Sequence, residues 1–188
     1  MKKIILASAS PRRRELIKYI SDDVTFMSAD IDETFNEKLG VVENVKQIAL
    51  KKAQYISSEI KASDSIIIGV DTIVCCDENV FTKPKDEEDA YYMLESLSAR
   101  SHSVISAVAL ICEGIEIVEH EETKVYFSEL SKEEIQEYIR LEKPFDKAGG
   151  YAVQGRAGVF VEKIEGCYYN IVGLPLNMLS RIIKENFK

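Results

Sequence analysis

The sequence lacks several features that would place it in a familiar class. No apolar run approaches the roughly 20 residues that span a bilayer. Met1-Lys2-Lys3 is followed by only a short aliphatic stretch, too short for the apolar region of a signal peptide. We therefore expect a cytoplasmic protein with no membrane partner. Basic residues are outnumbered, 24 Lys and Arg against 32 Asp and Glu, and the net charge of −8 argues against stable nucleic-acid binding.

Recognisable metal and redox motifs are also missing. None of the four cysteines forms a C-x-x-C pair, and neither of the two histidines is spaced to complete a zinc site. We expect free thiols in a reducing compartment. The Walker A motif is absent, which excludes a P-loop enzyme. The chain shows neither internal repeats nor low-complexity segments.

The most informative feature that is present is the run SASPRRREL at positions 8–16. Ser10 followed by Pro11 predicts an N-cap and the first position of a helix. The first turn of that helix then carries three arginines, although the positive end of the helix dipole prefers acidic residues. A bound phosphate would cancel this repulsion, so the pattern indicates an anion site. A solvated basic turn is the alternative, and helical geometry predicts that Arg14 faces solvent.

Apolar segments rich in Ile and Val alternate with helical patterns along the chain, which is typical of an α/β fold. We expect a mixed sheet flanked by helices, in two lobes with a cleft between them. Strands are predicted at 4–6, 24–27, 65–70, 72–76, 80–82, 102–112, 115–127 and 159–164. Helices are predicted at 11–20, 41–60, 86–97 and 131–140, with a last helix opening at 174–176.

Polar residues at the ends of these elements are candidates for chemistry. Asp71 follows a buried strand, where α/β sheets bind ligands, so it is a candidate general base or metal ligand; a turn or helix cap is the alternative. Lys83 precedes a proline and offers a point charge for phosphate, or it is a solvated lysine. Lys52 and Glu33, each considered alone, are most simply read as solvated charges. They become candidates for a site only together with the other charged residues named here.

A second polar group lies in the segment 146–155, DKAGGYAVQG. Its paired glycines permit positive φ and close approach of the backbone to a ligand. Lys147 and Gln154 supply polar side chains there, although a connection between lobes is the alternative. Cations at a helix start, further lysines, and carboxylates able to hold a divalent ion together indicate attack on a polyphosphate.

The chain resembles the Maf family of nucleoside triphosphate pyrophosphatases, over nearly its whole length and in order. The strings that carry this resemblance are LASASPRRREL (6–16), Ala49-x-x-Lys52-Ala53, GVDTIV (69–74), Lys83-Pro84, DKAG (146–149) and VGLPL (172–176).

The resemblance implies a single domain over 1–188 with the inosine triphosphatase-like fold. It also implies a hydrolase that converts a nucleoside triphosphate to monophosphate and pyrophosphate with Mg²⁺ or Mn²⁺. By position, Asp71 corresponds to the proton acceptor and, with Glu33, to a metal ligand. Lys52 and Lys83 join Asp71 as catalytic residues. The substrate-binding residues implied in this way are Ser8, Arg12, Arg13, Thr72, Lys147 and Gln154, of which Arg12, Thr72 and Gln154 are associated with base choice.

The segment YAVQG (151–155) looks like the branch of the family that acts on dTTP and UTP. Two alternatives stay open: a regulatory binding protein of septum formation, and a pyrophosphatase preferring another modified nucleotide such as 7-methyl-GTP. A homodimer is a candidate assembly. The chain departs from the family at Ser98-Ala99, where Ser-Gly is common, and at Ser106, where Thr is common. We expect the change to Ala99 to alter a turn.

Overall fold

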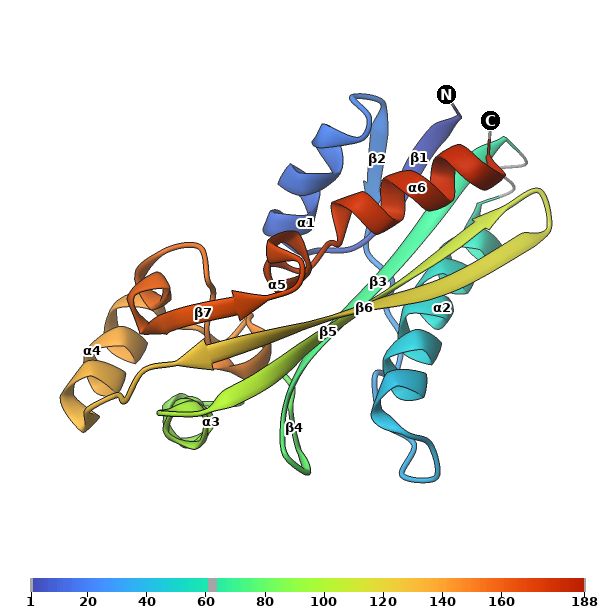
Figure 1. Cartoon of the computed structure of the whole chain (residues 1–188). Coiled ribbons are helices and arrows are strands. Elements are labelled where there is room, and N and C mark those ends of the chain that lie inside the picture. Colours follow the sequence, from blue (N-terminus) through green and yellow to red (C-terminus); the bar gives the residue numbers. More distant parts are fainter. Residues whose placement is uncertain (1, 61–63, 188) are drawn as a thin grey trace. The chain divides into compact units, whose positions relative to one another are not determined.

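The protein is a mixed α/β fold built on a seven-stranded sheet (Figure 1). The computed structural model describes residues 2–60 and 64–187. Along the sheet the strands follow the order β2-β1-β3-β5-β6-β7, and β4 pairs with β3. The strands are β1 (Lys3–Ala7), β2 (Val24–Met27), β3 (Ser65–Cys76), β4 (Asn79–Phe81), β5 (Ser101–Cys112), β6 (Ile115–Phe127) and β7 (Val161–Glu165). The helices are α1 (Pro11–Leu16), α2 (Val41–Glu59), α3 (Glu87–Leu97), α4 (Lys132–Glu142), α5 (Tyr168–Val172) and α6 (Leu176–Asn186).

The chain forms two compact units. The first unit comprises 1–71, 106–121 and 173–188, and the second comprises 72–105 and 122–172. The three long strands β3, β5 and β6 each contribute residues to both units. This explains why they are longer than a simple doubly wound sheet requires.

In the first unit, three parallel strands lie side by side (Figure 1). Ile4 of β1 pairs with Val24 of β2 on one side and with Ile66 of β3 on the other. Parallel neighbours need crossover connections, and α1 and α2 supply them. β1 and β3 are almost wholly apolar because residues on both of their faces are buried, as the sequence predicts for 65–70, whereas β2 at the end of the sheet is half-buried.

Gly69 sets the distance between β3 and α2. A Cβ atom at this position would lie 2.1 Å from the carbonyl oxygen of Ala49 and 2.7 Å from the backbone nitrogen of Ala53. Only glycine therefore lets the helix backbone approach the strand this closely. The contact matters for function because α2 and β3 carry the polar residues described below.

The second unit has its own apolar core, to which β3–β6, α3 and α4 contribute. β3 and β4 form the antiparallel hairpin predicted for 72–82, with Val74 opposite Phe81. β7 pairs antiparallel with β6. α4 begins with the predicted capping box, in which the side chain of Ser131 and that of Glu134 each bind the other's backbone nitrogen.

Some boundaries differ from those predicted. The strand expected to end at Asp71 continues through it to Cys76, because the residues after it pair onward with β4. Residues Arg156–Phe160 form a 3₁₀ turn, so β7 begins later than predicted. The short helix α5 was not predicted, since five residues show too little periodicity. Helix α1 ends at Leu16 and is followed by a 3₁₀ turn.

All four cysteines are free thiols, as expected. Within residues 2–60 and 64–187, the helices are all too short or too polar to cross a bilayer.

The departure from the family at Ala99 has a structural consequence. Ala99 has φ of 56°, in the left-handed region that favours glycine, and its backbone nitrogen donates to the carbonyl of Ser128 at 2.9 Å. The turn at Ala99 therefore keeps the backbone conformation that suits glycine. Because alanine occupies it, the turn is strained.

We predict that Ala99→Gly raises the free energy of unfolding by about 1 kcal/mol, because relief of left-handed strain outweighs the added entropy of the unfolded chain. Ala9→Gly is the matched control, because Ala9 is exposed and outside the left-handed region, and it should lower stability slightly. Urea unfolding measures both variants. A destabilised Ala99→Gly protein would show that the turn is not strained.

Candidate active site

The centre of the candidate site is the ammonium group of Lys52. Its Nζ lies 2.8 Å from Oδ1 of Asp71 and 2.9 Å from Oε1 of Glu33. Lys52 is on α2, Asp71 is in β3, and Glu33 is in the loop between β2 and α2. Three residues far apart in the sequence thus meet at one cation within the first unit.

Burial makes this arrangement energetically demanding. Lys52 and Asp71 are only 7% and 8% exposed, whereas the side chain of Glu33 is about half exposed. A buried charge is tolerated only when it is paired and hydrogen-bonded. The buried charges of Lys52 and Asp71 therefore each require the other as a partner. Glu33 is the member of the cluster that is accessible to solvent.

The loop of Glu33 is held by its own neighbours. Oδ1 of Asp32 accepts hydrogen bonds from the backbone nitrogen of Thr34 at 2.9 Å and from its hydroxyl at 2.5 Å. These two bonds lower the pKa of Asp32. The resulting turn fixes the backbone on both sides of Glu33. Asp32 was not among the predicted site residues, although Asp-x-Thr is a recognisable signal for such a turn.

Helix α1 begins as predicted, close to β3. Ser10 is the N-cap, and its side chain accepts from the backbone nitrogen of Arg13. The buried Ser8 accepts from the backbone nitrogen of Ser10 at 3.2 Å. The first turn contains no acidic residue, so the unfavourable pairing of arginines with the positive helix end is confirmed.

Arg13 ties this turn to β3. Its Nε donates to the carbonyl of Gly173 at 2.9 Å, and its Nη1 donates to the carbonyl of Val70 at 3.0 Å. Burial lowers the pKa of the guanidinium, and the nearby carboxylate of Asp71 opposes that shift. The group stays charged because an arginine does not lose its proton in a protein. Arg13 thus braces the strand one residue before Asp71.

The prediction that Arg14 faces solvent is wrong. Its Nε donates to the carbonyl of Ser8 at 3.2 Å, and its guanidinium lies over the ring of Phe26, 5.3 Å from the centroid. Both contacts hold Arg14 against its own unit. Its angular position on the helix did not predict them, because Phe26 belongs to strand β2. Arg12 is half-buried at the start of α1, in the same unit as the cluster.

The remaining candidates belong to the second unit. Thr72 is half-buried in β3, and Lys83 is exposed just beyond β4. The backbone nitrogen of Gly149 donates to the carbonyl of Thr82 at 3.1 Å, which places the segment of Lys147 beside that of Lys83. Lys147 forms an ion pair with Asp146 at 2.6 Å. Gln154 is exposed in a turn between Tyr151 and the 3₁₀ turn that follows.

Glu33 and Asp71 are the carboxylates from which ligands for a divalent cation could come. Both point at the ammonium group of Lys52, so a metal would have to share them with this lysine. Mg²⁺ is usually held by one or two carboxylates together with substrate phosphates and water. In the described part of the chain, no group of three or more His, Cys, Asp and Glu side chains could hold a metal. Any metal held by these two carboxylates would therefore need further ligands, such as the oxygens of a phosphate substrate.

The sequence also matches a known protein family. The family model described as "Maf-like protein" matches residues 3–186.

The chain belongs to the Maf family.

Relatives of this Maf protein are similar over their full length. A protein named dTTP/UTP pyrophosphatase from Alkaliphilus oremlandii (strain OhILAs) is 47% identical over 189 residues, covering 100% of this chain and 97% of that protein. One with the same name from Clostridium botulinum (strain Eklund 17B / Type B) is 46% identical, with 97% and 98% covered. The same name is given to a relative from Caldicellulosiruptor saccharolyticus that is 42% identical, with 98% and 95% covered.

Similarity to solved structures is weaker. A nucleoside-triphosphatase / dITP/XTP pyrophosphatase from Mycobacterium abscessus has a TM-score of 0.41 and 19% identity, covering 66% of this chain and 72% of that one.

We predict that Lys52→Met lowers the free energy of unfolding by about 3 kcal/mol, because it leaves the buried carboxylate of Asp71 without its cation. Lys51→Met is the matched control, since Lys51 is the exposed neighbour on the same helix and its loss should be nearly neutral. Equal stabilities of the two variants in urea unfolding would contradict the account of the cluster.

Proposed function

We propose that this Maf protein is a nucleoside triphosphate pyrophosphatase that hydrolyses dTTP and UTP to the monophosphate and pyrophosphate. The observation that carries the proposal is the convergence of Asp71 and Glu33 on Lys52, beside the arginine-bearing start of α1. The names of the relatives, which are 42–47% identical along their whole length, support the choice of substrates.

The chemistry follows from the charges. Water attacks the α-phosphorus, the bond between that phosphorus and the bridging oxygen breaks, and pyrophosphate leaves. Asp71 accepts the proton of the attacking water, as a general base does. Arg12 and Arg13 offset the negative charge of the triphosphate, while Lys52 holds the carboxylate of Asp71 in place. Catalysis of this kind is mainly positioning and charge neutralisation. Lys83 and Lys147 are proposed to add positive charge for the phosphates.

A divalent metal is part of the proposal. Glu33 and Asp71 would hold Mg²⁺ or Mn²⁺ together with oxygens of the substrate. When bound, such an ion polarises the phosphoryl oxygens and stabilises the charge that develops on them. We propose that the protein acts in the cytoplasm, with a homodimer as its candidate assembly.

Gln154 is proposed to read the base, with Arg12 and Thr72 also associated with base choice. Uracil and thymine present an acceptor at O4 and a donor at N3, which match the donor and the acceptor of one amide. Cytosine inverts this pattern, so an amide held in one orientation rejects it. The 5-methyl group of thymine adds only an apolar contact, and dTTP and UTP should therefore be used equally well.

The experiment that tests the activity is a panel of dTTP, UTP, CTP, GTP and 7-methyl-GTP with Mg²⁺ or Mn²⁺. Chromatography of the products should show UMP or dTMP with pyrophosphate. Diphosphate and orthophosphate as the primary products would contradict the proposed reaction, and a preference for 7-methyl-GTP would contradict the substrate.

We predict that Asp71→Asn lowers kcat at least about 100-fold, because it removes the general base and the charge that pairs with Lys52 while keeping the size of the side chain. Asp22→Asn, at an exposed position of the same unit, should leave kcat unchanged. Circular dichroism checks that both variants are folded. Near-normal turnover by folded Asp71→Asn protein would exclude Asp71 as the base.

We also predict that Gln154→Ala reduces the preference for UTP over CTP by about tenfold to a hundredfold, the discrimination expected of one bidentate amide pair. The quantity to measure is the ratio of kcat/KM for the two nucleotides. Gln136→Ala is the control, since Gln136 is an exposed glutamine on α4 of the same unit. An unchanged ratio in Gln154→Ala would show that Gln154 does not read the base.

A further inference from the structure

An exposed glutamine cannot discriminate between bases unless its segment is held in place. Gln154 lies in a turn, and Gly155, the residue after it, has φ of 107°, in the region that favours glycine. The amide can present either its donor or its acceptor, so its selectivity depends on the backbone that carries it. The structure shows how residues 151–156, here termed the glutamine loop, are fixed on both sides of Gln154.

The first attachment is to His102 of β5. Its Nε2 lies 2.7 Å from the hydroxyl of Tyr151, and both side chains are buried. The two rings pack edge to face against Phe127, with centroid distances of 4.8 Å for His102 and 4.9 Å for Tyr151. An apolar pocket thus encloses one polar contact, which fixes the beginning of the glutamine loop.

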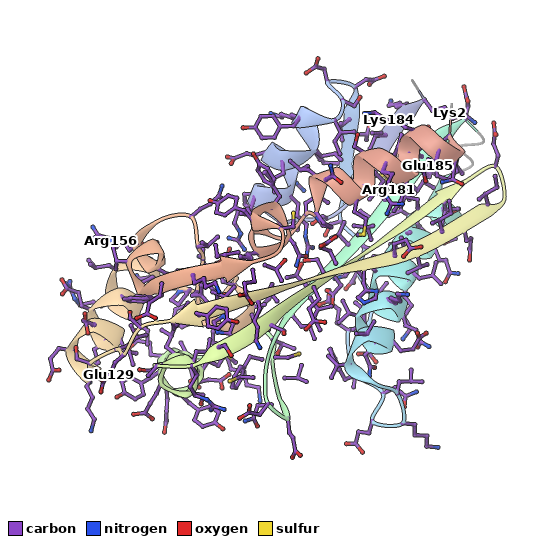
Figure 2. All side chains as sticks on the ribbon, viewed as in Figure 1. Lys2, Glu129, Arg156, Arg181, Lys184 and Glu185 are labelled. Atoms are coloured by element: carbon purple, nitrogen blue, oxygen red, sulfur yellow. The ribbon has the colours of Figure 1, made fainter. Side chains whose placement is uncertain are left out.

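Two further attachments come from α4. The hydroxyl of Tyr138 accepts a hydrogen bond from the backbone nitrogen of Ala152 at 3.2 Å. On the other side of Gln154, Nε of Arg156 (labelled in Figure 2) lies 3.3 Å from Oε1 of Glu142. The Arg156 pair is more exposed and therefore weaker. The buried contact between His102 and Tyr151 is the strongest of the three candidates for holding the loop.

The imidazole has a use here that packing alone does not explain. Burial lowers the pKa of His102 to about 4, so the ring is neutral at physiological pH. Its Nδ1 makes no hydrogen bond to any described residue. An apolar side chain would fill the same pocket without the cost of burying that nitrogen. The hydrogen bond to Tyr151 is what a histidine provides and an apolar residue does not.

We propose that His102 is a positioning residue for base recognition, which holds the glutamine loop through its hydrogen bond to the hydroxyl of Tyr151. This inference rests on the proposed use of pyrimidine triphosphates. The inference is that His102 affects base selectivity through the glutamine loop and not by contact with the substrate. The sequence alone indicated no functional role for His102 and only excluded it from a zinc site.

The test compares the ratio of kcat/KM for UTP to that for CTP in four variants: His102→Leu, His102→Gln, Tyr151→Phe, and the double variant of His102→Leu with Tyr151→Phe. Loss of the hydrogen bond should lower the ratio about tenfold in each single variant that lacks it. The double variant should lose no more than one single variant, because both changes remove the same contact. His102→Gln, whose amide can either donate to or accept from the hydroxyl of Tyr151 at a similar reach, should restore most of the ratio.

The outcomes separate positioning from a merely structural role. If His102→Leu lowers kcat/KM for UTP and CTP by the same factor, the residue only supports the fold and the inference is overturned. The same conclusion follows if glutamine rescues no better than leucine.

Gln154→Ala separates this inference from the role of Gln154. If it lowers the ratio while the His102 and Tyr151 variants do not, the reading of the base by Gln154 stands and the role of His102 is wrong. If Gln154→Ala has no effect but His102→Leu lowers the ratio and His102→Gln restores it, His102 positions a loop that reads the base through other groups.

Discussion

The candidate site depends on one buried ammonium group shared by two carboxylates. Lys52 can lie in the interior of the first unit only because Asp71 and Glu33 neutralise it, and the buried Asp71 needs Lys52 for the same reason. The close approach of α2 to β3 at Gly69 brings the lysine and the aspartate within reach. A small residue two positions before Asp71 is therefore as necessary to the site as the charged residues.

The two units contribute different kinds of chemistry. The first holds charge: the carboxylates, Lys52, and the basic start of α1, which Arg13 fastens to the carbonyls of Val70 and Gly173. The second unit contributes Lys83, Lys147 and a loop with an exposed amide, which is held by tyrosine hydroxyls and one neutral histidine. We infer that changes in this loop alter base selectivity without breaking the ion pairs of Lys52, Asp71 and Glu33.

Much of this arrangement could be predicted from the sequence, because it follows from local patterns. The apolar runs predicted β2 and β6 to the residue, and Ser10-Pro11 predicted the start of α1. What could not be predicted depended on contacts between distant segments. Arg14 packs on Phe26 of another strand, and the end of β3 is set by its pairing with β4. His102 acquires its partner from a residue 49 positions away, which no spacing rule indicates. The local turn at Asp32 was within reach of sequence reasoning and was overlooked.

The central claim is that water attacks the α-phosphorus of the nucleotide at the cluster of Asp71, Glu33 and Lys52. Hydrolysis of UTP in ¹⁸O-enriched water tests it most directly, because the oxygen from water stays on the phosphorus that it attacked. Mass spectrometry of the products should find one ¹⁸O atom in UMP and none in pyrophosphate. Label in the pyrophosphate, with UMP unlabelled, would place the attack on the β-phosphorus and contradict the account.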